Sequence, residues 1–81
     1  MAAKEHGVDR IALKAALAHV EKGIAAGEES IAAQRKLIAE LERAGADTTA
    51  QIQTLASLKK EQWRRIQRRE MLIRELAADP H

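Results

Sequence analysis

Residues 13–45 read LKAALAHVEKGIAAGEESIAAQRKLIAELERAG, and this stretch decides the fold. Stepping by four and then three residues visits Leu13, Leu17, Val20, Ile24, Gly27, Ile31, Gln34, Ile38, Leu41 and Gly45. Leu, Val or Ile fills most of these positions, and Gly or Gln fills the others. This spacing is typical of a helix with one narrow apolar stripe, as in coiled coils and helical bundles. Because such a stripe needs a cover, the pattern predicts helix association and no particular chemistry.

Capping residues set the ends of this first helix. Asp9 is suited to cap its start, and Gly45 can end it in a left-handed conformation, so we expect a helix over about 9–44. Gly7 makes an earlier start uncertain, although Ala2–His6 can extend the helix.

A second helix is predicted over about 49–78, after a turn at 45–48. Asp47 or Thr48 can cap it, with Thr48 and Gln51 spaced as a capping box, and Pro80 ends it. So short a connection makes the two helices antiparallel neighbours. The sequence therefore predicts an all-α fold in one domain over 1–81, an antiparallel helical hairpin.

The apolar face of the second helix is broader and less regular. It holds Ile52, Leu55, Leu58, Trp63, Ile66, Ile73 and Leu76, and Lys59, Gln62, Arg69 and Glu70 intrude on it or flank it. Met71 and Leu72 point away from its centre and hint at a second contact surface. Since two helices alone expose much of each stripe, we expect a homodimer that forms a four-helix bundle. Its predicted core is Ile24, Ile31, Ile38, Leu41, Ile52, Leu55, Trp63, Ile66 and Ile73.

Gly23 and Gly27 lie one helical turn apart inside the first helix, where Gly costs about 1 kcal/mol relative to Ala. They allow a facing helix to approach closely and to insert Trp63 or another bulky side chain. The alternative is a tolerated weak point or a slight kink. With these glycines, the predicted protein interface comprises Gly23, Gly27, Ile31, Ile38, Trp63, Ile66, Met71 and Leu72.

The sequence contains no arrangement of residues that suggests catalysis. There is no Cys, Ser30 and Ser57 have no His beside them, and His19 sits beside the apolar stripe. Paired carboxylates spaced with a His for metal binding are missing, and Glu28-Glu29 reads as a solvated face. We therefore expect no enzyme activity, no catalytic residue, no cofactor and no metal site.

The most unusual feature is a basic run in the second helix. Lys59, Lys60, Arg64, Arg65, Arg68 and Arg69 are opposed within the run by Glu61 alone, and Arg74 follows. A stripe formed by Lys60, Arg64, Arg68 and Arg74 can follow phosphates, whereas Arg65 and Arg69 form another stripe. Alternatively, these bases cover apolar surface and pair with acidic residues of a neighbouring chain, whose first helix supplies such acids. A basic amphipathic helix also permits binding to a membrane surface.

The segment His19–Leu58 resembles a group of short, uncharacterised bacterial helical proteins. The residues that carry the resemblance are His19, Gly27-Glu28, Ile31-Ala32, Gln34-Arg35, Leu37-Ile38, Leu41-Glu42-Arg43, Gly45 and Asp47-Thr48. The resemblance implies a helical hairpin and a bacterial cytoplasmic setting, and it implies no activity.

Together these observations favour a non-catalytic interaction or scaffold protein that associates with itself or with an unknown protein partner. The alternatives are a nucleic-acid-binding regulator that uses the basic stripe and, less favoured, a protein of the membrane surface. No apolar run approaches the roughly 20 residues that span a bilayer, and the N-terminal residues do not form a signal peptide, so we expect a cytoplasmic location.

Overall fold

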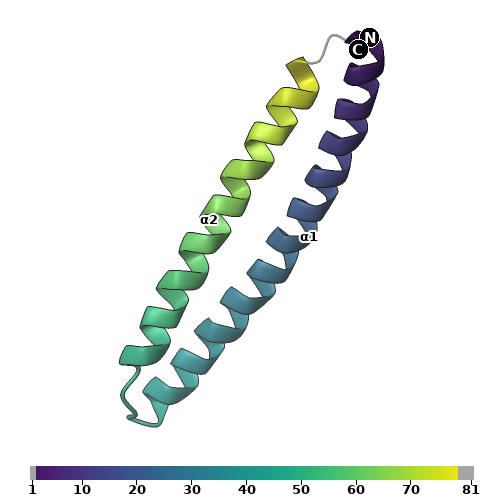
Figure 1. The fold of residues 1–81 in the computed structure, drawn as a ribbon. Helices are drawn as coiled ribbons and strands as arrows, with labels where there is room; N and C mark the ends of the chain where they lie inside the picture. Colours follow the sequence, from purple (N-terminus) through teal and green to yellow (C-terminus); the bar gives the residue numbers. More distant parts are fainter. Residues whose placement is uncertain (1, 79–81) are drawn as a thin grey trace.

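The computed structural model describes residues 2–78, with side chains described from residue 9 onward. It contains two helices, α1 (Ala2–Arg43) and α2 (Thr49–Ala78). The helices run antiparallel and side by side, so that the start of α1 and the end of α2 share one end of the molecule (Figure 1). The result is a rod of 64 × 15 × 14 Å. The predicted all-α helical hairpin is confirmed.

Helix α1 starts earlier than the capping signals indicate. It begins at Ala2 and passes through Gly7, and Asp9 lies inside the helix instead of capping its start. A single helical glycine costs only about 1 kcal/mol, and this cost does not stop a helix of such length. At the other end α1 stops at Arg43, one residue before the expected Ala44.

The turn between the helices is a Schellman motif centred on Gly45. Gly45 adopts a φ of 74°, the left-handed conformation that glycine reaches without a steric penalty. The Ala46 N–H donates to the Leu41 carbonyl at 2.9 Å, and the Gly45 N–H donates to the Glu42 carbonyl at 3.0 Å. These bonds satisfy carbonyls that the end of α1 leaves open. The predicted role of Gly45 as helix terminator is confirmed.

Asp47 holds the start of α2. Its Oδ1 accepts hydrogen bonds from the Thr49 backbone N–H at 3.1 Å and from the Thr49 hydroxyl at 2.7 Å. Of the two capping residues considered, Asp47 therefore supplies the side chain, while the Thr48 carbonyl accepts the first helical bond from Ile52 at 2.9 Å. Since both bonds favour the ionised carboxylate, they lower the pKa of Asp47, with the Thr49 hydroxyl contributing most.

This lowered pKa predicts a pH-dependent contribution of Asp47 to stability. Since the pKa in the folded chain lies below the ordinary value of 3.8, the contribution is present above that value and is lost as the pH falls through the folded-state pKa. We expect Asp47→Ala to lower the melting temperature at pH 7 and to have a much smaller effect at pH 2. Thermal denaturation followed by circular dichroism measures both differences. An equal loss at the two pH values would show that the charge of Asp47 plays no part.

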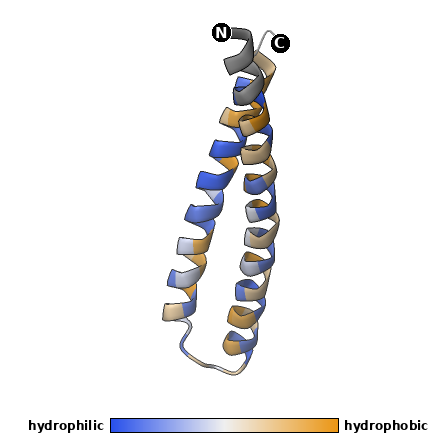
Figure 2. Cartoon of the chain, turned by 45° about the vertical axis from the view of Figure 1, so that its right-hand side comes forward, coloured by the Kyte–Doolittle hydropathy of each residue, from blue (hydrophilic) through white to orange (hydrophobic). Residues whose placement is uncertain are grey.

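The two helices meet along a seam that α1 supplies as expected. On α1, the residues from Leu13 to Leu41 that follow the alternating spacing of four and three, called here the 4-3 line, are all buried or half-buried. On α2 the buried and half-buried positions also follow a 4-3 line, which comprises Gln51, Leu55, Leu58, Gln62, Arg65, Arg69, Leu72 and Leu76. Leucines therefore flank the three polar residues in the middle of this line, and Gln51 stands at its start. Hydrophobic and hydrophilic stretches alternate along both helices (Figure 2).

The α2 seam corrects the predicted face of that helix. Leu72, expected to point away from the first helix, is buried and packs with Val20 and Ile24. Met71 lies outside the seam and is 58% exposed. Because the centre of the seam lies about 75° around the helix from the line through Ile52, Ile66 and Ile73, most of the predicted apolar face is turned to the side.

The apolar core of a single chain is small. Among the described side chains, Val20, Ile24 and Leu72 are the buried hydrophobic ones. Of the residues predicted to form a bundle core, Ile31, Ile38, Leu41, Leu55 and Ile66 are half-buried. By contrast, Ile52, Trp63 and Ile73 are 51%, 61% and 42% exposed in the single chain. Neither helix contains, within residues 2–78, an apolar stretch that could cross a bilayer.

Candidate functional site

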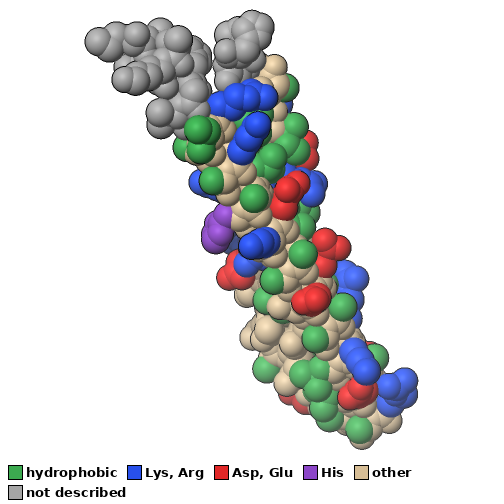
Figure 3. All heavy atoms as spheres, turned by 90° about the vertical axis from the view of Figure 1, so that its right-hand side faces the viewer, with side chains coloured by type: hydrophobic (Ala, Val, Ile, Leu, Met, Phe, Trp, Pro, Cys, Tyr) green, Lys and Arg blue, Asp and Glu red, His purple; other side chains and the backbone are tan. Residues whose placement is uncertain are grey.

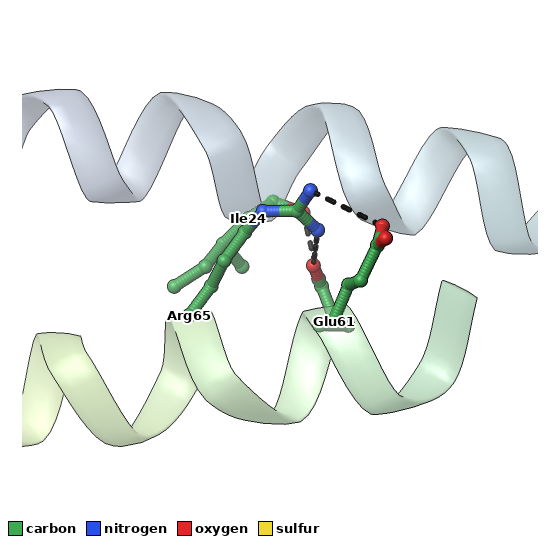
Figure 4. A network of polar contacts seen from close by, with 4 residues as sticks. Ile24, Glu61 and Arg65 are labelled. Carbon is green, nitrogen blue, oxygen red and sulfur yellow. Dashed lines mark hydrogen bonds and ion pairs between the residues drawn. The ribbon is translucent and has the colours of Figure 1, made fainter. Parts of the chain in front are cut away.

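A buried amide lies at the middle of the seam. The Gln62 side chain is 6% exposed, and its Nε2 donates to the backbone carbonyl of Ile24 at 2.8 Å. Arg65 Nη1 donates to Gln62 Oε1 at 3.1 Å, and Arg65 Nη2 lies 3.9 Å from Glu61 Oε1. Figure 4 shows this group reaching from α2 across to Ile24 of α1. Since both ends of the amide are satisfied, Gln62 ties the helices together without the cost of an unpaired buried polar group.

Gly27 provides the space for this amide. A Cβ atom at Gly27 would collide with Gln62 Oε1 and would come within 2.8 Å of Gln62 Cδ and 2.9 Å of Arg65 Nη1. At Gly23 a Cβ atom would meet Arg65 Cδ at 3.4 Å, which is ordinary contact. A close approach is therefore found at Gly27 and not at Gly23. The inserted side chains are Gln62 and Arg65, whereas Trp63 is exposed.

An open groove lies next to this amide on one side of the hairpin. It has a volume of about 460 Å³. Its lining consists of three isoleucines, the Gln62 amide and three charged residues: Ile24, Ile31, Ile66, Gln62, Glu28, Arg35 and Arg69. Both helices therefore contribute apolar side chains to its floor, and charges of both signs stand at its rim.

The apolar surface continues beyond the groove along α2. Ile52 and Ile73 are separated from Ile66 by whole multiples of seven residues, so all three lie on one side of the helix. Trp63 lies one turn before Ile66 at the edge of this side. We call the surface formed by Ile24, Ile31, Ile52, Ile66, Ile73 and Trp63 the open face. It is a partly exposed apolar surface, interrupted on α2 by Lys59, on a chain with little apolar core.

Arg69 leaves one polar atom unsatisfied at the groove. Its Nε is buried and has no hydrogen-bond partner within residues 9–78. Its Nη2 lies 3.5 Å from Glu70 Oε2, on the exposed part of the side chain. A buried N–H without a partner costs about 1–3 kcal/mol. This buried N–H therefore lowers the stability of the seam next to the groove.

The predicted basic residues fall into two groups. Arg65 and Arg69 are half-buried in the seam, each close to a carboxylate of α2. A second group is exposed on the side of α2 that faces away from α1 and has no ion pair within the described residues: Lys60, Arg64, Arg68 and Arg74. The acidic residues of the first helix form no ion pair with this stripe within residues 9–78 of one chain, and pairing with a neighbouring chain stays a prediction.

The remaining polar residues form no catalytic arrangement among those described. His19, Ser30 and Ser57 are exposed, and no group of His, Asp and Glu within residues 9–78 is arranged to hold a metal ion. No protein family, no curated protein and no solved structure matches this chain. The resemblance to bacterial hairpin proteins therefore stays a prediction, and the functional argument depends on the surfaces.

Sequence reasoning placed Gln62 and Arg69 only as intruding on or flanking the apolar face, and it placed Arg65 in a basic stripe and not in the seam. Their signal was present, because the 4-3 line through Leu55 and Leu58 continues to Gln62, Arg65, Arg69, Leu72 and Leu76. Such polar residues in the middle of a mostly apolar seam can be predicted only if the regular residue spacing is given more weight than the hydrophobicity of each residue. The two glycines opposite this centre were the second signal.

Proposed function

We propose that this chain is a non-catalytic helical interaction protein, and that its first partner is a second copy of itself docked on the open face. The large solvent-accessible area of the single chain supports this proposal. The chain exposes 6197 Å², whereas a compact monomer of 9.0 kDa is expected to expose about 4900 Å². The excess of about 1300 Å² is comparable with what one subunit buries in a stable dimer.

The chemistry of the groove fits a copy of the same chain. A two-fold interface pairs one surface with itself, so a rim that carries both Glu28 and Arg35 can neutralise its own copy. The isoleucines of the floor can pack against the same isoleucines, as in the core of a four-helix bundle.

Sedimentation equilibrium over a range of concentrations tests this proposal. We expect a mass of about 18 kDa, twice that of the chain. Emission from Trp63, the only aromatic residue, should shift to shorter wavelength as the dimer forms, because its ring becomes covered. A monomeric chain that stays fully helical at micromolar concentration would overturn the proposal.

Substitutions on the open face should weaken the dimer selectively. Ile52→Gln combined with Ile73→Gln changes four side chains in the dimer, at about 1 kcal/mol each, so we expect the dissociation constant to rise roughly 1000-fold. Both residues are exposed in the single chain, and the hairpin should therefore persist. The matched control is Ile11→Gln with Met71→Gln, which alters two exposed residues outside the open face. Equal weakening by the control would contradict this choice of face.

A further inference from the structure

The outer side of α2 has a charge pattern that self-association through the open face does not use. Lys60, Arg64, Arg68 and Arg74 are all exposed there. Within the described residues none of them forms an ion pair. Glu61 lies 3.9 Å from Arg65, on the edge of the seam, and the exposed Glu75, directly after Arg74, is the acid on this side of α2. We propose that these four residues bind the phosphate backbone of double-helical nucleic acid, without reading its sequence.

The cations are spread along one side of α2 over a length that can follow a regular polyanion. Lys60, Arg64 and Arg68 follow one another at four-residue intervals, or about 6 Å along the helix. Arg74 lies about 120° around the helix from Arg68 and close to the line of Lys60, and it extends this basic row to about 21 Å. A duplex carries one phosphate per strand for about 3.4 Å of its axis, so the row covers about six base pairs. Three of the four are Arg, whose planar guanidinium group can bind phosphate through two hydrogen bonds.

The arrangement distinguishes this face from the rest of the hairpin. On α1, six basic and six acidic residues alternate between Asp9 and Arg43. Figure 3, viewed from the α1 side, shows Lys and Arg side chains interspersed with Asp and Glu side chains. With a formal net charge of only +2 for the whole chain, attraction to a polyanion should depend on the outer side of α2 and not on overall charge.

A duplex suits this face better than the other polyanionic surfaces. Proteins that bind single strands stack bases on aromatic side chains, and the only aromatic residue, Trp63, lies at the edge of the open face. Membrane-surface helices bury an apolar face in the lipid, but the apolar side chains of α2 lie mainly in the seam against α1 or on the open face, to the side of the four basic residues. The outer side contributes only Met71 as a large apolar residue between Lys60 and Arg74.

Fluorescence anisotropy with a labelled 20-base-pair duplex, as DNA and as RNA, tests the inference. Four phosphate contacts predict a slope of log K against log salt of about −3.6 for DNA, for each chain engaged. Affinity should therefore fall about 150-fold between 50 and 200 mM NaCl. No binding at 50 mM NaCl would overturn the inference. The test does not depend on the dimer, because sedimentation decides that proposal separately.

A matched pair of variants separates this face from general electrostatics. Arg64→Gln with Arg68→Gln should reduce affinity at 50 mM NaCl at least tenfold and make the slope shallower by about 1.8. Lys22→Gln with Lys36→Gln removes the same charge from exposed positions of α1 and should change affinity less than about twofold. Equal losses in the two variants would overturn the inference.

Flotation of vesicles that contain anionic phospholipid tests whether the same basic residues bind a membrane surface instead of a duplex. Binding of vesicles without binding of duplex would overturn the inference and assign the basic face to membranes. Duplex binding with the expected variant pattern supports the inference whether or not vesicles also bind. Melting curves of both variants that match the parent chain would show that the hairpin is intact.

Discussion

Replacing Gly27 with Leu is expected to lower the free energy of unfolding by about 3 kcal/mol, because the new side chain needs the space of the Gln62 amide. Even its Cβ would collide with Gln62 Oε1 and lie 2.8 Å from Gln62 Cδ. Gln62 would have to leave the seam and would lose its bond to the Ile24 carbonyl. Chemical denaturation followed by circular dichroism at fixed protein concentration measures the change.

Gly23→Ala is the control for this prediction. Its Cβ would lie 3.4 Å from Arg65 Cδ and 3.5 Å from Arg65 Nε, at normal contact distance. Since Ala is the better helix former, the variant should gain up to about 1 kcal/mol. Combining Gly27→Leu with Gln62→Ala should cost less than the sum of the two single changes, because the second removes the side chain with which the first collides. An unchanged melting point for Gly27→Leu would contradict the close packing.

Truncating Leu72 to Ala is expected to cost about 3 kcal/mol, the usual loss when a buried leucine leaves a cavity. Leu72 is 7% exposed and packs with Val20 and Ile24, which are the other buried hydrophobic residues among those described. For a domain of this length the melting temperature should fall by roughly 12–24 °C. Because association also stabilises a protein, all variants must be compared at one concentration.

Met71→Ala provides the neighbouring control. Met71 is 58% exposed and lies outside the seam, so the loss should stay within about 0.5 kcal/mol. This pair decides between the seam of the structure and the apolar face predicted from composition, which placed both residues outside it. Similar losses for the two variants would contradict the position of the seam.

The contrast between the helices explains how far the sequence could predict the fold. In α1 one set of residues supplies both the regular spacing and the hydrophobicity, so its seam from Leu13 to Leu41 was predicted correctly. The turn was predictable as well, because the left-handed conformation of Gly45 has a local cause. Both results need only interactions within a few residues or one repeating pattern.

In α2 spacing and hydrophobicity separate. Ile52, Ile66 and Ile73 lie beside the seam, while Gln62, Arg65 and Arg69 occupy its centre. A prediction based on hydrophobicity therefore placed the contact face of α2 to one side of the actual seam. It assigned Trp63 to the core and placed Leu72 away from the centre of the face. The preference for Gln62 arises from Gly27 and the Ile24 carbonyl on the other helix. Such a long-range partner is invisible when each helix is read alone.

The fit of Gln62 against Gly27 also fixes the axial register of the hairpin. If α2 slid along α1 by one heptad, Gln62 would face Val20 or Gln34, which lie seven residues to either side of Gly27 on the same line. Both carry the Cβ atom that Gly27 lacks. The Gln62 amide would therefore lose both the space opposite Gly27 and the hydrogen bond to the Ile24 carbonyl. The close fit is thus possible at one position only, and the polar centre of the seam sets how the two helices align along their length.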